Sequence, residues 1–157
     1  LALVLYAAPT GQWTGRGTGK THLASAIANA VQKRGWRVTS WVMPELMAML
    51  RSSYGPGNDE GGGIEDWTMI RRAGEADLLV LDDVGAEHFR DWGWYQEKLY
   101  LILNRRTGRG PVVITSNLDK GQIPGWIGTS AFSRLWQMTR QGELVVDMSG
   151  PDWRWRL

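Results

Sequence analysis

The stretch Gly15-Arg16-Gly17-Thr18-Gly19-Lys20-Thr21 decides what this chain folds into. It follows a continuous apolar run over residues 1–6, which is typical of a buried parallel strand. Residues 20–34 come after it and carry apolar side chains at helical spacing. In a loop between such a strand and helix, backbone N–H groups surround phosphate oxygens, the lysine reaches the β and γ phosphates, and the hydroxyl binds Mg²⁺. The sequence therefore predicts a phosphate-binding loop for ATP and Mg²⁺.

This loop departs from the usual pattern G-x-x-x-x-G-K-[ST] at its first position. Thr14 stands where the first glycine belongs, and we expect Gly15 and Gly17 to supply the backbone freedom instead. The alternative is a glycine-rich turn that happens to contain Lys-Thr, which the flanking strand and helix disfavour. The position of His22 on the first helical turn favours a structural role over a catalytic one. The predicted ATP-binding residues are Thr14, Gly15, Arg16, Gly17, Thr18, Gly19, Lys20, Thr21 and His22.

Polar side chains end two later apolar runs. Asp82 and Asp83 close the run over residues 77–82, where Asp82 would hold Mg²⁺ together with Thr21 and Asp83 would polarise the attacking water. Asn117 follows the run over residues 111–115 and would orient that water. The alternatives are two solvated carboxylates at a strand-end turn and an Asn that caps the next turn.

Strand and helix patterns alternate along the whole chain. Beyond the first strand and helix, we expect strands over residues 36–42, 77–82, 111–115 and 144–147, and helices over 44–51, 64–73, 92–106 and 130–139. This alternation predicts an α/β fold with three layers and a five-stranded parallel sheet. The glycine-rich residues 55–63 are expected to form a flexible loop inside one domain.

Composition limits the classes of function. The chain has 157 residues, enough for one domain with its own core, and its formal charge of +2 is too small to argue nucleic-acid binding. It has no cysteine, which excludes disulfides and cysteine-ligated zinc. No apolar run reaches the length of a membrane span, and no signal peptide is recognisable, so we expect a cytoplasmic protein without a membrane partner. Because the chain opens inside a strand without Met, we expect a fragment lacking an N-terminal part.

Several motifs in order carry a resemblance to a known family. They are Gly17-Thr-Gly-Lys-Thr-His-Leu-Ala24, Leu78-Leu-Val-Leu-Asp-Asp-Val-Gly-Ala-Glu87, Val113-Ile-Thr-Ser-Asn-Leu118, Phe132-Ser-Arg-Leu135 and Gly150-Pro-Asp-Trp-Arg154. Together they resemble the AAA+ ATPases of the DnaC/DnaI helicase-loader and IstB group over nearly the whole chain. The resemblance implies one AAA+ domain over residues 1–157, a P-loop NTPase of the ASCE type without a C-terminal lid domain.

The same resemblance assigns roles to the loop and the acidic strand end. Lys20 and Thr21 match the Walker A lysine and hydroxyl, and Asp82 matches the Walker B residue that holds magnesium. Asp83 occupies the position of the catalytic base, which is Glu in most AAA+ proteins and often Asp in this group. The shorter side chain favours slow hydrolysis. Asn117 matches the sensor 1 residue.

Two arginines complete the implied set. Arg134 matches the arginine finger, which would reach the γ-phosphate held by a neighbouring subunit and make hydrolysis depend on assembly. Arg154 matches the sensor 2 arginine. The alternatives are that Arg134 is a solvated helix residue and that Arg154 is tail charge stacked on Trp153 or Trp155.

In helicase loaders, the segment that matches residues 45–76 helps bind single-stranded DNA. Here it contains aromatic and arginine side chains, which suit base stacking and phosphate contact. The alternative is that Trp67 belongs to the core and that the arginines form a solvated helix face. The DNA-contact candidates are Arg51, Tyr54, Arg71 and Arg72.

These features predict an ATPase that loads a replicative helicase onto single-stranded DNA, assembling into a ring or spiral. A close alternative is an IstB-like ATPase that assists DNA transposition with a transposase as partner. A small-molecule or nucleoside kinase uses the same loop, but the sequence offers no obvious lid, and Asn117 with Arg134 is then unexplained. A third alternative is an ATP-dependent clamp that hardly hydrolyses, with Asp83 a poor base.

Overall fold

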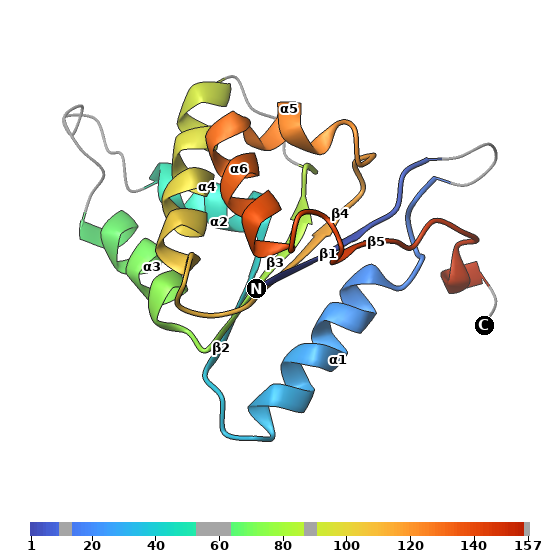
Figure 1. Ribbon diagram of the computed structural model, residues 1–157, viewed down its shortest axis with the longest axis horizontal. Helices are drawn as coiled ribbons and strands as arrows, with labels where there is room; N and C mark the ends of the chain where they lie inside the picture. Colours follow the sequence, from blue (N-terminus) through green and yellow to red (C-terminus); the bar gives the residue numbers. More distant parts are fainter. Residues whose placement is uncertain (10–13, 53–63, 87–90, 156–157) are drawn as a thin grey trace.

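The computed structural model describes residues 1–9, 14–52, 64–86 and 91–155, with the side chains of residues 64–66 and 155 left aside. Its centre is a five-stranded sheet in the order β2-β3-β4-β1-β5, in which each strand runs parallel to its neighbours (Figure 1). The strands are β1 (Ala2–Tyr6), β2 (Val38–Val42), β3 (Leu78–Val84), β4 (Val112–Ser116) and β5 (Val145–Asp147). The predicted five-stranded parallel sheet is confirmed.

Helices lie on both faces of this sheet and make the expected three layers (Figure 1). The first helix, α1, packs against β2, β3 and β4 on one face, and the others lie on the opposite face. The helices are α1 (Lys20–Gln32), α2 (Met43–Ser52), α3 (Ile64–Glu75), α4 (Trp92–Arg106), α5 (Ile123–Ile127) and α6 (Thr129–Met138). In the described ranges, no helix is both long and apolar enough to cross a bilayer.

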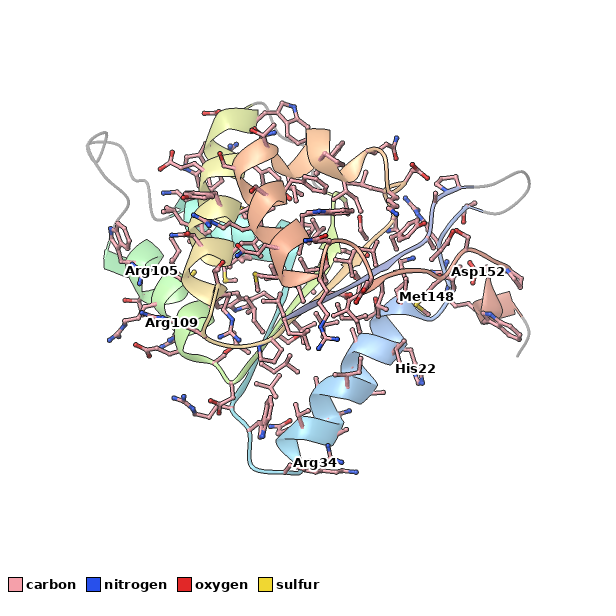
Figure 2. All side chains as sticks on the ribbon, in the orientation of Figure 1. His22, Arg34, Arg105, Arg109, Met148 and Asp152 are labelled. Atoms are coloured by element: carbon pink, nitrogen blue, oxygen red, sulfur yellow. The ribbon has the colours of Figure 1, made fainter. Side chains whose placement is uncertain are left out.

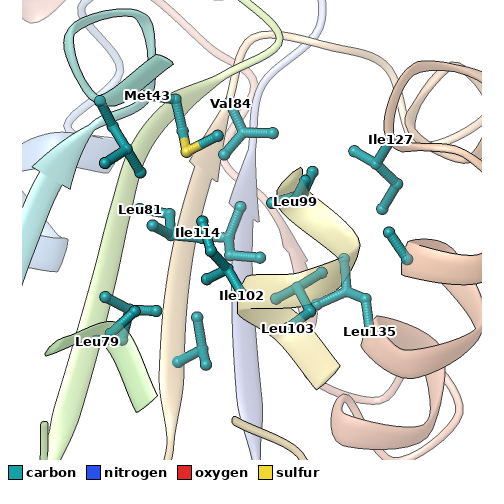
Figure 3. Packing of buried hydrophobic residues seen from close by; sticks show 14 of the residues in the cluster. Met43, Leu79, Leu81, Val84, Leu99, Ile102, Leu103, Ile114, Ile127 and Leu135 are labelled. Carbon is teal, nitrogen blue, oxygen red and sulfur yellow. The ribbon is translucent and has the colours of Figure 1, made fainter. Parts of the chain in front are cut away.

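The two faces of the sheet bury different amounts of apolar surface. Side chains that alternate along each strand point to opposite faces, so Leu79 and Leu81 join α2 and α4 while Leu78 and Val80 face α1. Figure 3 shows the larger cluster, in which Leu99 and its neighbours on α4 lie against β3 and β4. Burial of each such side chain stabilises the fold by about 1.5–3 kcal/mol, which holds the carboxyl ends of the strands rigid.

Some element boundaries differ from the sequence-based prediction. Strand β3 runs two residues further, through Asp83 to Val84, with a register shift against β4 between Leu81 and Val84. The short helix α5, with Pro124 in its first turn, and the 3₁₀ turn Trp153–Trp155 were not predicted from the sequence. Both are too brief to produce a helical apolar pattern, so sequence periodicity could not reveal them.

A buried arginine joins three elements beneath the sheet. Arg106, at the end of α4, is fully buried, and its Nη1 donates to the carbonyls of Ala73, Gly74 and Ala76. Its Nη2 donates to the carbonyl of Pro111 at 2.8 Å, just before β4. These carbonyls end α3 and lead into β3, so one guanidinium satisfies acceptors that a helix C-terminus otherwise leaves open.

Candidate nucleotide-binding site

The loop between β1 and α1 has the backbone that phosphate binding needs. Gly15, Gly17 and Gly19 adopt φ of 72°, 66° and 94°, a region that L side chains rarely occupy. A Cβ on Gly15 would lie 2.2 Å from the Ala7 carbonyl oxygen, so this position also lacks room for a side chain. The glycine missing at Thr14 is therefore supplied one residue later, as the sequence predicted. Thr14 is exposed, and its hydroxyl accepts from the Arg16 N–H at 3.3 Å.

Lys20 folds back over this loop. It is 6% exposed, and its Nζ donates to the Gly15 carbonyl at 2.6 Å and to Thr18 Oγ1 at 3.4 Å. Burial lowers the pKa of its ammonium, and the carboxylates of Asp83 and Asp82 oppose that shift. The ammonium thus lies within the loop, and its predicted contact with phosphate oxygens stays a prediction.

The loop and the acidic strand end meet through a hydroxyl. Thr21, the second residue of α1, donates its hydroxyl to the Asp82 carboxylate at 3.0 Å from Oδ1 and 3.1 Å from Oδ2. A carboxylate and a hydroxyl are the hard oxygen ligands that Mg²⁺ prefers, and Mg²⁺ is usually held by one or two carboxylates plus substrate phosphates. Among the described residues no group of three or more His, Cys, Asp or Glu gathers to hold a metal by itself. The pair therefore suits a metal that arrives with a nucleotide.

Asp83 is held in a strained backbone conformation beside this pair. Its φ is 57°, which is unusual for a residue with a side chain. Its N–H donates to Thr115 Oγ1 at 2.9 Å, and its Oδ1 accepts from Asn117 Nδ2 at 3.4 Å. The register shift that ends regular β3 pairing at Leu81 gives room for this turn. The structure thus brings Asp83 and Asn117 together.

The environment of Asp83 weakens its acidity. Burial raises the pKa of its carboxyl, and the neighbouring charge of Asp82 raises it further. Lys20, Arg16 and the amide of Asn117 oppose this shift. A carboxylate with a raised pKa is a better proton acceptor than an ordinary aspartate, which suits a general base.

Thr115, at the end of β4, links the Asp82 carboxylate to the Asp83 backbone and was not singled out from the sequence. It is fully buried; its hydroxyl donates to Asp82 Oδ1 at 2.5 Å and accepts from the Asp83 N–H. The available signal was its position two residues before Asn117, which places both side chains on the same face of the strand end. A Thr at a strand end is too common for that signal to suffice.

The end of the chain closes one side of the site. The N–H of Trp153 donates to the Gly17 carbonyl at 3.0 Å. Arg154 forms an ion pair with Asp152, so a carboxylate holds its guanidinium. Figure 2 shows Asp152 and His22 on the same side of the molecule, near the start of α1.

These side chains surround an open cleft of about 770 Å³, within the usual size of small-molecule sites. Most of the residues predicted from the sequence line it, together with Ala86 and Trp153, which were not predicted. The predicted residues that line it are Arg16, Gly17, Thr18, Gly19, Lys20, Thr21, His22, Asp83, Asn117 and Arg154. The predicted loop, base candidate, amide and terminal arginine therefore share one cleft, with Asp82 behind Thr21.

Comparison with known proteins assigns the family. Residues 11–151 match the family described as IstB-like ATP binding protein. The chain belongs to this family. Two curated relatives are protein YdaV of Escherichia coli K12, named there as uncharacterized and 34% identical over 139 residues, and the replicative helicase loader DnaC of the same strain, 25% identical over 122 residues. They are matched over 88% and 76% of this chain but 52% and 46% of their own lengths, so the chain spans about half of each.

Solved structures share the fold of this IstB-like protein. A DnaC helicase loader has a TM-score of 0.66 at 22% identity over 96% of this chain and 78% of its own. DnaI gives 0.63 at 24% identity over 94% and 72%, and AMPPCP-bound DnaA from Aquifex aeolicus gives 0.60 at 23% over 92% and 39%. The AAA+ P-loop architecture expected from the motifs is confirmed.

Arg134 stands apart from the cleft of this IstB-like protein. It is half-buried on α6 and is not among the residues that line the cleft. Within one chain it is therefore not placed against the loop. A role as arginine finger requires a second subunit and stays a prediction.

The predicted DNA contacts lie on α2 and α3. Arg51, Arg71 and Arg72 are exposed, whereas Tyr54 lies outside the described residues. Trp67 is 52% exposed, and the Arg105 guanidinium lies 5.3 Å from its ring centre, so the alternative that Trp67 is a core residue is wrong. Figure 2 shows Arg105 beside α3, on the side of the molecule away from Asp152.

Proposed function

We propose that this IstB-like protein binds ATP with Mg²⁺ and hydrolyses it slowly to ADP and phosphate. The observation that carries the proposal is the hydrogen bond between Thr21 and Asp82, 61 positions apart in the chain, at the foot of the Lys20 loop. A phosphate-binding loop alone is consistent with many nucleotide-binding proteins. Its junction with a carboxylate is the arrangement that holds a metal-bound triphosphate.

Each residue of the cleft then has a chemical task. Lys20 and the loop N–H groups bind the β and γ phosphates, and Thr21 with Asp82 holds the metal. Mg²⁺, when bound, neutralises charge on the phosphate oxygens. Asp83 accepts a proton from the attacking water, and Asn117 orients that water.

Two arginines would act on the γ-phosphate. Arg154 approaches from the same chain, because it already lines the cleft. Arg134 approaches from a neighbouring subunit, because its helix lies elsewhere. Hydrolysis would then require assembly into a ring or spiral, in which charge that develops in the transition state meets a positioned guanidinium.

We further propose that the biological task is to load a replicative DNA helicase onto single-stranded DNA. Similarity to the named loader DnaC and the exposed arginines and Trp67 of α2 and α3 support this task. Arginine and aromatic side chains together suit single-stranded DNA, which offers phosphates and unstacked bases. Assistance to a transposase is the alternative within the family, and it uses the same ATP chemistry.

Nucleotide binding tests the site directly. Lys20→Ala is expected to abolish ATP binding, measured by titration of a fluorescent ATP analogue. Lys33→Ala is the matched control, since it removes an exposed lysine just after the same helix and is expected to bind normally. Tight binding by Lys20→Ala would refute the site.

Phosphate release, measured with and without single-stranded DNA, tests the proposed activity. We expect slow release that DNA accelerates. Release that depends on an added nucleoside or small metabolite would instead indicate a kinase. Tight ATP binding with no release under either condition would indicate a clamp that does not hydrolyse. Recruitment of helicase or transposase to DNA in the presence of ATP separates the two biological tasks.

A further inference from the structure

The last described residues fold back across the phosphate-binding loop and form a strap, defined here as residues 148–154. The strap leaves β5 where the Met148 N–H donates to the Tyr6 carbonyl at 2.7 Å. It reaches the loop where the Trp153 N–H donates to the Gly17 carbonyl at 3.0 Å. Two backbone hydrogen bonds therefore tie the strap to β1 and to the loop.

Within the strap, the Asp152 carboxylate accepts hydrogen bonds from one edge of the Arg154 guanidinium. Its Oδ1 accepts from the Arg154 backbone N–H at 3.0 Å and from Nε at 2.9 Å, and its Oδ2 accepts from Nη2. The Asp152 side chain is 17% exposed, whereas that of Arg154 is 64% exposed. The carboxylate is thus the more buried partner, and Nη1 takes no part in the contacts with Asp152.

The carboxylate of Asp152 is itself fixed against the loop. A Cβ on Gly17 would lie 1.7 Å from Asp152 Oδ1 and 2.7 Å from Arg154 Nε. The space that any other residue would fill at position 17 is therefore occupied by the ion pair. Glycine is required at position 17 for two reasons: it leaves space for the ion pair, and its φ of 66° is one that other residues rarely adopt.

We propose that Asp152 is a positioning residue for the nucleotide site, which holds Arg154 so that its outer edge meets the γ-phosphate of ATP. This inference rests on the proposed function, because it takes the cleft to bind ATP. A guanidinium already held by a carboxylate loses little rotational freedom when it binds a phosphate, so the ion pair favours triphosphate over diphosphate. Through Arg154, the strap thereby distinguishes ATP from ADP by the γ-phosphate.

Two other roles for Asp152 make different predictions. As a simple anchor of the chain end, it would support ATP and ADP binding equally. As a negative charge beside the loop, it would weaken binding of phosphates, and its removal would tighten ATP binding. The positioning role alone predicts a loss confined to ATP that vanishes when Arg154 is already absent.

The test compares ATP and ADP dissociation constants by titration with fluorescent nucleotide analogues. The proteins are the unmodified chain, Asp152→Asn, Arg154→Gln, the double variant and Asp77→Asn. Asp77 is the matched control, since its carboxylate also pairs with an arginine, Arg37, and neither residue is among those that line the cleft. We expect Arg154→Gln and Asp152→Asn each to reduce the preference for ATP over ADP by roughly tenfold, with ADP affinity unchanged. The double variant should match Arg154→Gln, and Asp77→Asn should match the unmodified chain.

Three results would overturn the inference while leaving the proposed function intact. They are an equal loss of ATP and ADP affinity in Asp152→Asn, tighter ATP binding in that variant, and additive losses in the double variant. If the unmodified chain does not bind ATP, the proposed function is wrong and the inference falls with it. Circular dichroism of each variant confirms that the fold is retained before the ratios are compared.

Discussion

Replacement of Thr115 by valine tests whether the link between the Asp82 carboxylate and the Asp83 backbone controls hydrolysis. Valine has nearly the same shape, so the change removes a hydroxyl and leaves the packing at this fully buried position in place. The hydroxyl donates to Asp82 Oδ1 at 2.5 Å and accepts from the Asp83 N–H at 2.9 Å. Thr115→Val therefore breaks both contacts at once.

The size of the effect follows from these two contacts. Asp82 keeps its hydrogen bond from Thr21, whereas the Asp83 N–H loses its acceptor. An unsatisfied buried donor costs about 1–3 kcal/mol, and a lost hydrogen bond to a charged group costs a similar amount. We expect unfolding free energy to fall by about 2–4 kcal/mol, within the 5–15 kcal/mol of a typical domain.

The effect on hydrolysis should be larger than the effect on ATP binding. Asp83 holds an unfavourable φ of 57°, and the bond to Thr115 is one of the contacts that maintain it. Relaxation by about 1 Å would misplace the base and slow phosphate release by roughly a hundredfold. ATP affinity should change less, because Asp82 keeps its hydrogen bond from Thr21 and Lys20 keeps its contacts with Gly15 and Thr18.

The assay measures kcat for phosphate release and ATP affinity, with Thr115→Ser as the control. Serine keeps the hydroxyl, so it should retain most of the rate despite a small loss of packing. A role for the hydroxyl is refuted if Thr115→Val releases phosphate at the unmodified rate, or if serine and valine slow it equally. Equal slowing would mean that any change of packing at this position disturbs the site, because valine keeps the methyl group and serine keeps the hydroxyl.

Further predictions concern the base, the buried arginine and the arginine finger. Because burial raises the pKa of Asp83 and the base must be ionised, phosphate release should begin to fall with decreasing pH above the ordinary aspartate pKa of about 3.9; a rate that stays constant down to that pH contradicts this. Arg106→Met should lower unfolding free energy by about 2–4 kcal/mol in denaturant melts, because buried carbonyls lose their donors, whereas exposed Arg109→Met should not. Arg134→Ala should bind ATP normally but lose DNA-stimulated release, and unchanged turnover removes the finger role.

Much of the site was predictable because its chemistry sits in local patterns. The loop residues are contiguous, and Gly15 compensates for Thr14 within the same turn. Asp82 and Asn117 could be placed because parallel strands end at the same edge of a sheet. These inferences need only strand ends and residue types.

Contacts between residues far apart in the sequence were harder to predict. Thr115 lies 33 positions from Asp82, and Asp152 lies far along the chain from Gly17. Neither contact produces a periodic pattern or a motif in the sequence, so the partners of Thr115 and Asp152 could be identified only from the folded structure. The exposure of Trp67 is of the same kind, because an aromatic residue on a helix suits either a core or a surface.

Local patterns were enough to predict the α/β class, the phosphate-binding loop and the polar strand ends, since hydrophobic periodicity and glycine positions can be recognised within a few residues. Tertiary structure alone decided the strand order β2-β3-β4-β1-β5, the bridge at Thr115 and the strap over Gly17. The difference lies in how far apart in the sequence the interacting residues are. Backbone preferences operate between neighbouring residues, whereas the hydrogen bonds that arrange Asp83 and Arg154 join distant segments that only packing of the core brings together.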